Sequence, residues 1–251
     1  MSSDDFSTIL SDASSTLTGN LGAVVLAGAA GTALEDIMAA DVTLITVLID
    51  ASQSIEQGGL TKAVRAGQNE LIDALLAAKE VDSILLAQWI FNDQLRVQHS
   101  YVPVADAAKL DAKSYHPAGG TALYDAWQSA LTANVSYAQK LRDGGTPVRS
   151  VVVVITDGED NSSRVSAAQC AKLSRALLAS EQFVLAFVGV GNEVDFRKVA
   201  RSMGLPDGGI LVQASATAHA LRQVFEMVSR SAIRASQGLI KPGAQAGFFG
   251  P

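Results

Sequence analysis

The distribution of apolar residues along the chain predicts buried strands that alternate with amphipathic helices. Continuous aliphatic and β-branched runs, such as VTLITVLI at 42–49 and VVVVIT at 151–156, are typical of strands buried on both faces. Further strands are expected at 84–91, 183–190 and 209–213. Amphipathic helices are expected from residue 52 onward and at 121–141, 165–180, 193–203 and 217–234.

Two local patterns add detail to this alternation. Asn92 and Asp93 form a predicted turn into residues 94–104, so this segment should pair with 84–91 as an antiparallel hairpin at one sheet edge. The helix from residue 52 is expected to be long, with one apolar stripe formed by Val64, Leu71, Ile72, Leu75 and Ala78. The predicted fold is α/β and Rossmann-like: a doubly wound, mostly parallel sheet with one antiparallel edge strand and helices on both faces.

The chain of 251 residues is expected to hold one domain at 41–235 between two extensions. Residues 1–40 begin with an acidic arm over 1–20 that is rich in Ser, Thr and Asp and predicted to be mobile. An Ala- and Gly-rich segment at 22–40 follows, with a short helix expected against the main domain. Residues 236–251 contain Gly and Pro and are predicted to form an irregular tail.

Composition and charge exclude several classes of protein. With 48% hydrophobic residues the chain can bury a large core, which argues against global disorder. The net charge of −6 argues against nucleic acid and against an anionic membrane surface as partners. A single cysteine, Cys170, cannot form an internal disulfide and is interpreted as a core thiol. Because the first Lys or Arg is Lys62, no basic secretory signal region precedes the domain, and a cytoplasmic location is expected.

Polar residues that could carry chemistry follow the predicted strands. The first strand runs into Asp50, Ser52 and Ser54, the strand at 151–156 runs into Asp157, and a glycine-rich loop between them ends at Thr121. In open parallel sheets, ligands bind beyond the carboxyl ends of the strands. Two carboxylates and three hydroxyls form an oxygen set suited to Mg²⁺ or Mn²⁺, which prefer six oxygen ligands.

These five residues resemble the metal-ion-dependent adhesion site (MIDAS) of von Willebrand factor A (VWA) domains. The motif is Asp50-x-Ser52-x-Ser54, then Thr121, then Asp157, in the order of the family. The phrases GGTALYDA at 119–126 and VITDGEDNSS at 154–163 are also similar to bacterial members. The resemblance covers about residues 41–235, judged from the order of the elements.

The resemblance implies that Ser52, Ser54 and Thr121 coordinate the ion directly, while Asp50 and Asp157 act largely through bridging waters. The ion would then keep enough positive character to bind an Asp or Glu carboxylate of a partner protein. One departure is Gln53-Ser54-Ile55, where many members have Gly-Ser-Met. It changes the rim of the site without touching a ligand.

Each part of the motif also has a structural interpretation. Asp50, Ser52, Ser54 and Thr121 could cap helices, and Asp157 with Gly158 could form a turn. What favours the metal site is that all of them occur together at converging strand ends.

The expected function is a non-catalytic, metal-dependent protein-interaction module. By analogy with intracellular bacterial relatives, it would serve as an adaptor for a MoxR-type AAA+ ATPase or a tellurite-resistance-type stress-response complex. Two alternatives stay open: a metal-assisted hydrolase or phosphatase, for which the sequence places no convincing general base, and a cell-surface adhesin.

Overall fold

The computed structural model describes residues 11, 15, 17, 20–243 and 247–249. The predicted acidic arm over 1–20 lies largely outside these residues. The strands are β1 (Val42–Asp50), β2 (Ile84–Phe91), β3 (Leu95–Pro103), β4 (Val148–Thr156), β5 (Phe183–Val190) and β6 (Ile210–Gln213). The α-helices are α2 (Asn20–Gly28), α3 (Gln53–Gln57), α4 (Thr61–Leu76), α5 (Leu123–Asp143), α6 (Ala167–Ala179), α7 (Phe196–Ser202) and α8 (Ala218–Ser236). Short 3₁₀ turns lie at Leu34–Asp36, Val81–Ser83, Val104–Asp106 and Asp207–Gly209.

The described strands form one six-stranded sheet in the order β3-β2-β1-β4-β5-β6. β3 pairs antiparallel with β2, and all other neighbours are parallel. The predicted fold class is therefore confirmed, including the antiparallel edge hairpin. The strand order changes direction between β1 and β4, which is the topological switch point of a doubly wound sheet.

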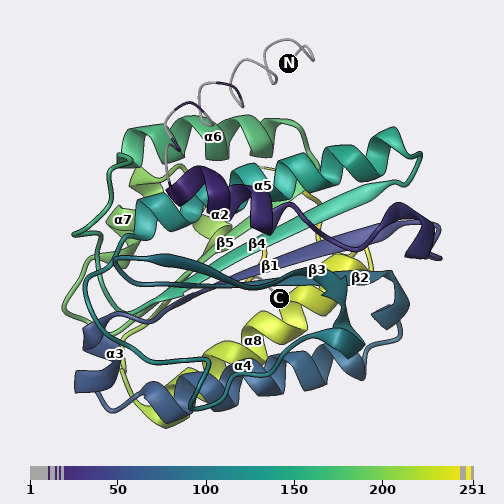
Figure 1. The fold of residues 1–251 in the computed structure, drawn as a ribbon. Coiled ribbons are helices and arrows are strands. Elements are labelled where there is room, and N and C mark those ends of the chain that lie inside the picture. Colours follow the sequence, from purple (N-terminus) through teal and green to yellow (C-terminus); the bar gives the residue numbers. More distant parts are fainter. Residues whose placement is uncertain (1–10, 12–14, 16, 18–19, 244–246, 250–251) are drawn as a thin grey trace.

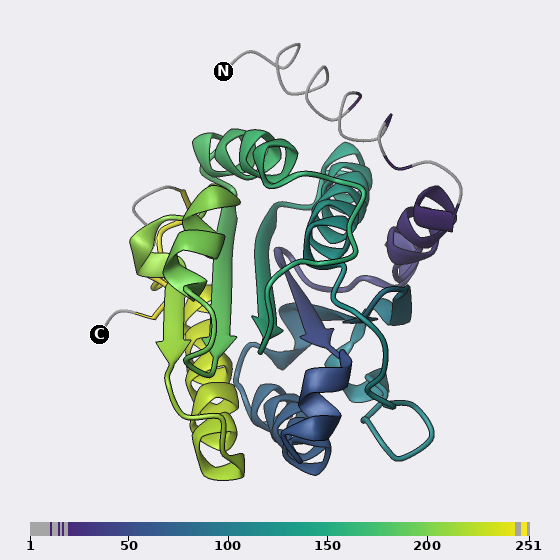
Figure 2. The same cartoon turned by 90° about the vertical axis from the view of Figure 1, so that its left-hand side faces the viewer.

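Helices cover the sheet on both faces (Figures 1 and 2). One face lies under α2, α5, α6 and α7, and the other lies on α4 and α8. Successive residues of β1 point to opposite faces, so Leu44 and Leu48 join the first core while Ile45 and Val47 join the second. Both faces are thus buried, which explains why β1 and β4 are continuous apolar runs rather than alternating ones.

The long helix expected from residue 52 is wrong, because the chain forms two helices there. α3 ends at Gln57, and Gly59 adopts a left-handed φ of +68° before α4 begins. Glycine takes this conformation without the steric cost that other residues carry, so it ends α3 and lets the chain change direction. Ala78 lies beyond the end of α4 and is only half-buried. The break leaves Ser52 and Ser54 on a separate one-turn element at the sheet edge.

Helix α2 packs against the core of the domain, as expected from the sequence for a short helix before residue 40. It lies against α5 and β3, and Gly28 is buried. A Cβ built on Gly28 would lie 2.0 Å from Cζ2 of Trp89, and one on Gly31 would lie 2.4 Å from Cζ of Tyr137. The rings of Tyr101 and Tyr137 stack beside Gly31, with their centroids 4.8 Å apart. The chain therefore covers β2 and β3 with a segment that lies outside the predicted domain bounds.

The interpretations of single core residues agree with the structure. Trp89, Trp127 and Cys170 are fully buried, and burial raises the pKa of the Cys170 thiol well above its usual range. The described part of the C-terminal tail contains no helix or strand beyond Ser236. It is nevertheless anchored, because Phe248 is fully buried in the core that also contains α4 and α8.

His99 of β3 should make the stability of the fold depend on pH. Burial lowers its pKa below 6.5, although a hydrogen bond to the carbonyl oxygen of Leu86 at 3.1 Å opposes this shift. The unfolded chain therefore binds a proton more readily, and the free energy of unfolding should fall as pH drops through 6.5 toward the lower native pKa. Urea titrations at pH 7.5 and 5.0 should show that the free energy of unfolding falls less between these pH values for His99→Gln than for wild type. Equal losses would contradict this assignment.

Candidate metal centre

The predicted site residues converge at the carboxyl ends of β1 and β4, which are neighbours in the sheet. Ile49 pairs with Ile155 in the ladder, so Asp50 and Asp157 leave the sheet side by side. The loop before α5 is tied to the same edge by two backbone bonds. The backbone amide of Ala118 donates to the carbonyl of Ala51 at 2.8 Å. The backbone amide of Gln53 donates to the carbonyl of Gly119 at 3.1 Å.

Hydroxyl and carboxylate oxygens of the motif lie in direct contact. The Ser54 hydroxyl donates to Oδ1 of Asp157 at 2.7 Å, and the Ser52 hydroxyl lies 3.5 Å from the same oxygen. The two serine Oγ atoms are 3.0 Å apart. Three oxygen atoms from two strand ends thus surround one point, although Ser54 and Asp157 are 103 residues apart in the sequence.

Thr121 faces the same strand ends from the loop before α5. A Cβ built on Gly158 would lie 3.4 Å from Oγ1 of Thr121, so this hydroxyl is directed at the residue after Asp157. Asn161 holds the backbone of Thr121 by two hydrogen bonds. Its side-chain oxygen accepts from the Thr121 backbone amide at 2.8 Å, and its own backbone amide donates to the Thr121 carbonyl at 3.0 Å. The structure therefore links Asp50, Ser52, Ser54 and Asp157 by hydrogen bonds and places the hydroxyl of Thr121 beside Gly158, the residue after Asp157.

Asp50 is the buried member of the group, with 1% of its surface exposed. Oδ1 accepts from the Ser52 amide at 2.7 Å and Oδ2 from the Thr156 hydroxyl at 2.5 Å. Burial, together with the nearby Asp157 carboxylate, raises the pKa of Asp50 to about 6 against the opposing hydrogen bonds from Thr156 and Ser52. Burial also raises the pKa of Asp157. A bound cation would compensate the negative charges of the buried Asp50 and the half-buried Asp157.

The structure argues against the capping interpretation of these residues. Ser52 occupies the N-cap position of α3, yet its side chain makes no capping hydrogen bond, and the N-cap position of α5 belongs to Ala122 rather than to Thr121. By contrast, Ser166, Asp195 and Thr217 do cap their helices through side-chain oxygens. The hydroxyl of Ser52 is directed at Ser54 and Asp157 instead.

Three supporting residues were not identified from the sequence. Thr156 binds the Asp50 carboxylate, Asn161 holds the Thr121 backbone, and the Tyr115 hydroxyl donates to the Asp50 carbonyl at 2.5 Å. Thr156 and Asn161 lie beside Asp157 in the sequence, which is a signal that could have been used. Tyr115 lies 65 residues from Asp50 in a loop and has no such signal.

The oxygen set fits a hard divalent cation. Among the residues that the structure describes, no group of three or more His, Cys, Asp and Glu side chains is placed to hold a metal. A site here therefore depends on hydroxyl ligands with two carboxylates, which is chemistry suited to Mg²⁺ or Mn²⁺.

A doubly wound sheet with an oxygen-rich group at its switch point defines an α/β protein of the Rossmann-like class with a candidate cation site. The model of the von Willebrand factor type A domain family matches residues 45–227. The chain belongs to this family.

Solved structures with the same fold come from several organisms. Proximal thread matrix protein 1 from the mussel byssus, in a structure with a zinc-occupied MIDAS motif, is 18% identical with a TM-score of 0.53. The match covers 77% of this chain and 46% of that one. The PilB minor pilin of Streptococcus sanguinis, as its D319A mutant, is 12% identical with a TM-score of 0.57, over 82% of this chain and 65% of that one. The pilus adhesin SpaC of Lactobacillus rhamnosus GG is 14% identical with a TM-score of 0.54. This match covers 78% of this chain and 30% of the adhesin chain.

At these identities the likeness concerns the fold, and this chain spans less than half of the length of the mussel protein. No curated protein shows significant sequence similarity to the chain. In the part of the chain that the structure describes, no helix is both long and apolar enough to cross a bilayer.

Proposed function

We propose that the chain binds Mg²⁺ or Mn²⁺ through Ser52, Ser54 and Thr121, with Asp50 and Asp157 acting largely through water. The observation that supports this most directly is the contact among the two serine hydroxyls and Oδ1 of Asp157, at 2.7 to 3.5 Å. When bound, the ion would supply a Lewis-acidic position for an oxygen ligand from outside. Belonging to a family with a known metal-dependent site supports the same proposal.

The ligand from outside is proposed to be an Asp or Glu carboxylate of a partner protein. Ser54 is exposed and Asp157 half-buried, whereas Asp50 lies beneath them, so the site opens to solvent on one side. Three neutral hydroxyls in the coordination shell leave the charge of the ion incompletely neutralised. A partner carboxylate would therefore be attracted, and it would complete the coordination shell.

We propose that the chain has no catalytic activity of its own. Hydrolysis at such an ion needs a group that accepts a proton from the attacking water. The carboxylates at the site are hydrogen-bonded to Ser52, Ser54 and Thr156, which suits them to holding the ion. Absence of phosphatase turnover with Mg²⁺ or Mn²⁺ is the expected result. Turnover that disappears in Asp157→Ala would overturn this part of the proposal.

The cellular setting is proposed by analogy with the family: a cytoplasmic bacterial adaptor that works with a MoxR-type AAA+ ATPase or a stress-response complex. Cell fractionation tests the location. A pull-down with and without EDTA, compared with Asp50→Ala, tests whether an ATPase of this type is bound through the site. Recovery in the envelope or surface fraction would favour the adhesin alternative, and several structural neighbours are pilus proteins.

Metal-dependent recognition of a carboxylate can be tested without knowing the partner. The ¹⁵N-labelled full chain would be titrated with a Gly/Ser peptide that carries one Asp, in Mg²⁺ and then in EDTA. Shifts of backbone signals around Ser54 and Gly119 are expected with Mg²⁺ only. The same peptide with Asn in place of Asp is the matched control, because it lacks only the charge. Binding that is equal for both peptides, or unchanged in EDTA, would refute the proposal.

A further inference from the structure

A hollow of about 390 Å³ adjoins the candidate metal centre on the side of the β2–β3 hairpin. It lies next to the metal centre because Ala51, between Asp50 and Ser52 in the sequence, forms part of its wall. Its other lining residues come from the hairpin and from the loop before Thr121: Ile90, Asn92, Gln94, Leu95, Arg96, Lys113, Ser114 and His116. We call this feature the hairpin hollow.

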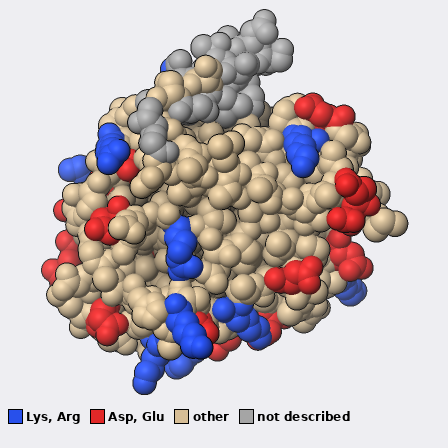
Figure 3. All heavy atoms as spheres, viewed as in Figure 1, with Lys and Arg blue, Asp and Glu red and all other residues tan. Residues whose placement is uncertain are grey.

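The hairpin hollow is lined by basic side chains. Arg96, Lys113 and His116 are all exposed and come from two separate segments. Hydrogen bonds from Ser114 and from the Lys113 amide lower the pKa of Asp111, and the charge of Lys113 lowers it further, so this carboxylate offsets part of the charge of Lys113. In Figure 3 Lys and Arg side chains lie over the lower part of this face, around α4, with Asp and Glu side chains among them.

The basic groups are held in place by the fold. The Arg96 guanidinium donates to Oε1 of Gln98 at 2.5 Å and to the carbonyl of Ser114. Asp111 accepts from the amides of Lys113 and Ser114 at 2.8 and 2.7 Å, which fixes the turn that carries Lys113. An arginine already held in this way loses less side-chain entropy when it binds an anion.

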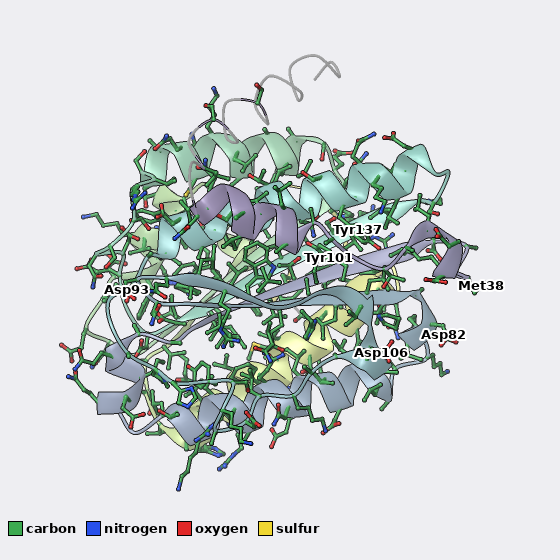
Figure 4. All side chains as sticks on the ribbon, viewed as in Figure 1. Met38, Asp82, Asp93, Tyr101, Asp106 and Tyr137 are labelled. Atoms are coloured by element: carbon green, nitrogen blue, oxygen red, sulfur yellow. The ribbon has the colours of Figure 1, made fainter. Side chains whose placement is uncertain are left out.

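The rim of the metal centre is therefore asymmetric in charge. Glu56 follows Ser54 on α3, while Glu159 and Asp160 follow Asp157, so the side of α3 and of the β4 loop is acidic. Asp93, at the tip of the hairpin, lies beside Gly119 (Figure 4). An acidic partner segment that crosses the metal would be repelled on the side of α3 and the β4 loop. On the hairpin side Asp93 offsets part of the positive charge, and the attraction comes from Arg96 and Lys113.

We propose that the hairpin hollow binds a second carboxylate from the same partner segment whose first carboxylate binds the metal ion. The partner motif would thus be a pair of acidic residues, with Arg96 as the main contact of the second. This inference rests on the proposed metal-dependent function and extends it to the partner sequence that the site would recognise. Arg96 determines specificity and has no part in holding the metal.

The second contact should contribute modestly, because exposed ion pairs are weak. We expect an acidic pair to bind about two- to fivefold more tightly than a single acid, the range of exposed ion pairs. The gain should shrink as salt is raised, because mobile ions screen exposed charges.

The test is a chemical-shift titration of the ¹⁵N-labelled full chain in Mg²⁺ with five Gly/Ser peptides. One carries a single Asp, and each of the other four carries a second Asp at one, two, three or four residues from the first. At least one spacing should bind more tightly than the single acid and should shift the signals of Arg96 and Ser114. Arg96→Gln should remove this advantage and leave the affinity for the single acid within twofold of wild type. Lys79→Gln, at an exposed lysine beyond the far end of α4, is the matched charge control.

The outcomes separate the two proposals. If none of the peptides binds the wild-type chain in Mg²⁺, the proposed function fails and this inference fails with it. If the single acid binds only with metal but no spacing of the pair improves on it, the metal site stands and the role of the hairpin hollow is refuted. Equal losses in Arg96→Gln and Lys79→Gln would also refute it, because they would show a general effect of net charge.

Discussion

Asp157→Ala should weaken the binding of Mg²⁺ or Mn²⁺ by about 10–100-fold, the range for a residue that orients a metal's ligands. Its Oδ1 is the oxygen that the Ser54 and Ser52 hydroxyls approach. Removing it takes away the charge that compensates the cation, and both serines lose the partner that positions them. Calorimetric titration of the full chain with Mn²⁺ measures the loss.

The fold of this variant should stay intact. Burial raises the pKa of Asp157, so its ionised form is disfavoured in the metal-free protein and its removal should cost little stability. Thermal unfolding in EDTA should therefore be cooperative and close to wild type. Glu159→Ala, which removes an exposed carboxylate two residues away, is the control and should retain its metal affinity. If both variants lose affinity equally, Asp157 has no specific role.

Gly28→Ala should destabilise the protein by about 1–3 kcal/mol, the usual cost of overpacking a filled core. A Cβ at this position would lie 2.0 Å from Cζ2 and 2.5 Å from Cη2 of Trp89, which is fully buried in β2. Either α2 moves away from the sheet or the indole leaves its position. Denaturant titration should show the loss, and the melting temperature should fall by about 2–4 °C per kcal/mol.

Two variants make this prediction specific. Leu26→Ala removes an exposed side chain from the same helix and should change stability by less than about 0.5 kcal/mol. Trp89→Phe shortens the ring that the new methyl group meets, so the double variant with Gly28→Ala should be more stable than the sum of the single effects predicts. Strict additivity would show that α2 does not pack against Trp89. A full effect in Gly28→Ala would show that the domain begins before residue 41.

Local pattern predicted most of the secondary structure. The bounds of β2 and β5 agree with the expectation to the residue, because both strands are buried throughout and their apolar runs end where burial ends. The prediction of one long helix from residue 52 failed at Gly58 and Gly59, where the chain changes direction. The apolar stripe on which it rested begins only at Val64, beyond this break. α5 begins at Leu123 rather than 121, which leaves Thr121 in the loop with its hydroxyl free for the site.

The sequence by itself determined the order of strands and helices, their buried faces and the five oxygen-bearing residues, since these depend on periodicity and on residue type at strand ends. The tertiary structure alone decided how these residues meet. It put β1 beside β4, buried Asp50 beneath Ser54 and Asp157, and brought Tyr115 and Arg96 to the same edge. Local pattern does not encode such contacts, because they join residues 65 to 103 positions apart through packing of the whole sheet. The charge around the candidate metal centre, and with it the proposed choice of partner, arises from those long-range contacts.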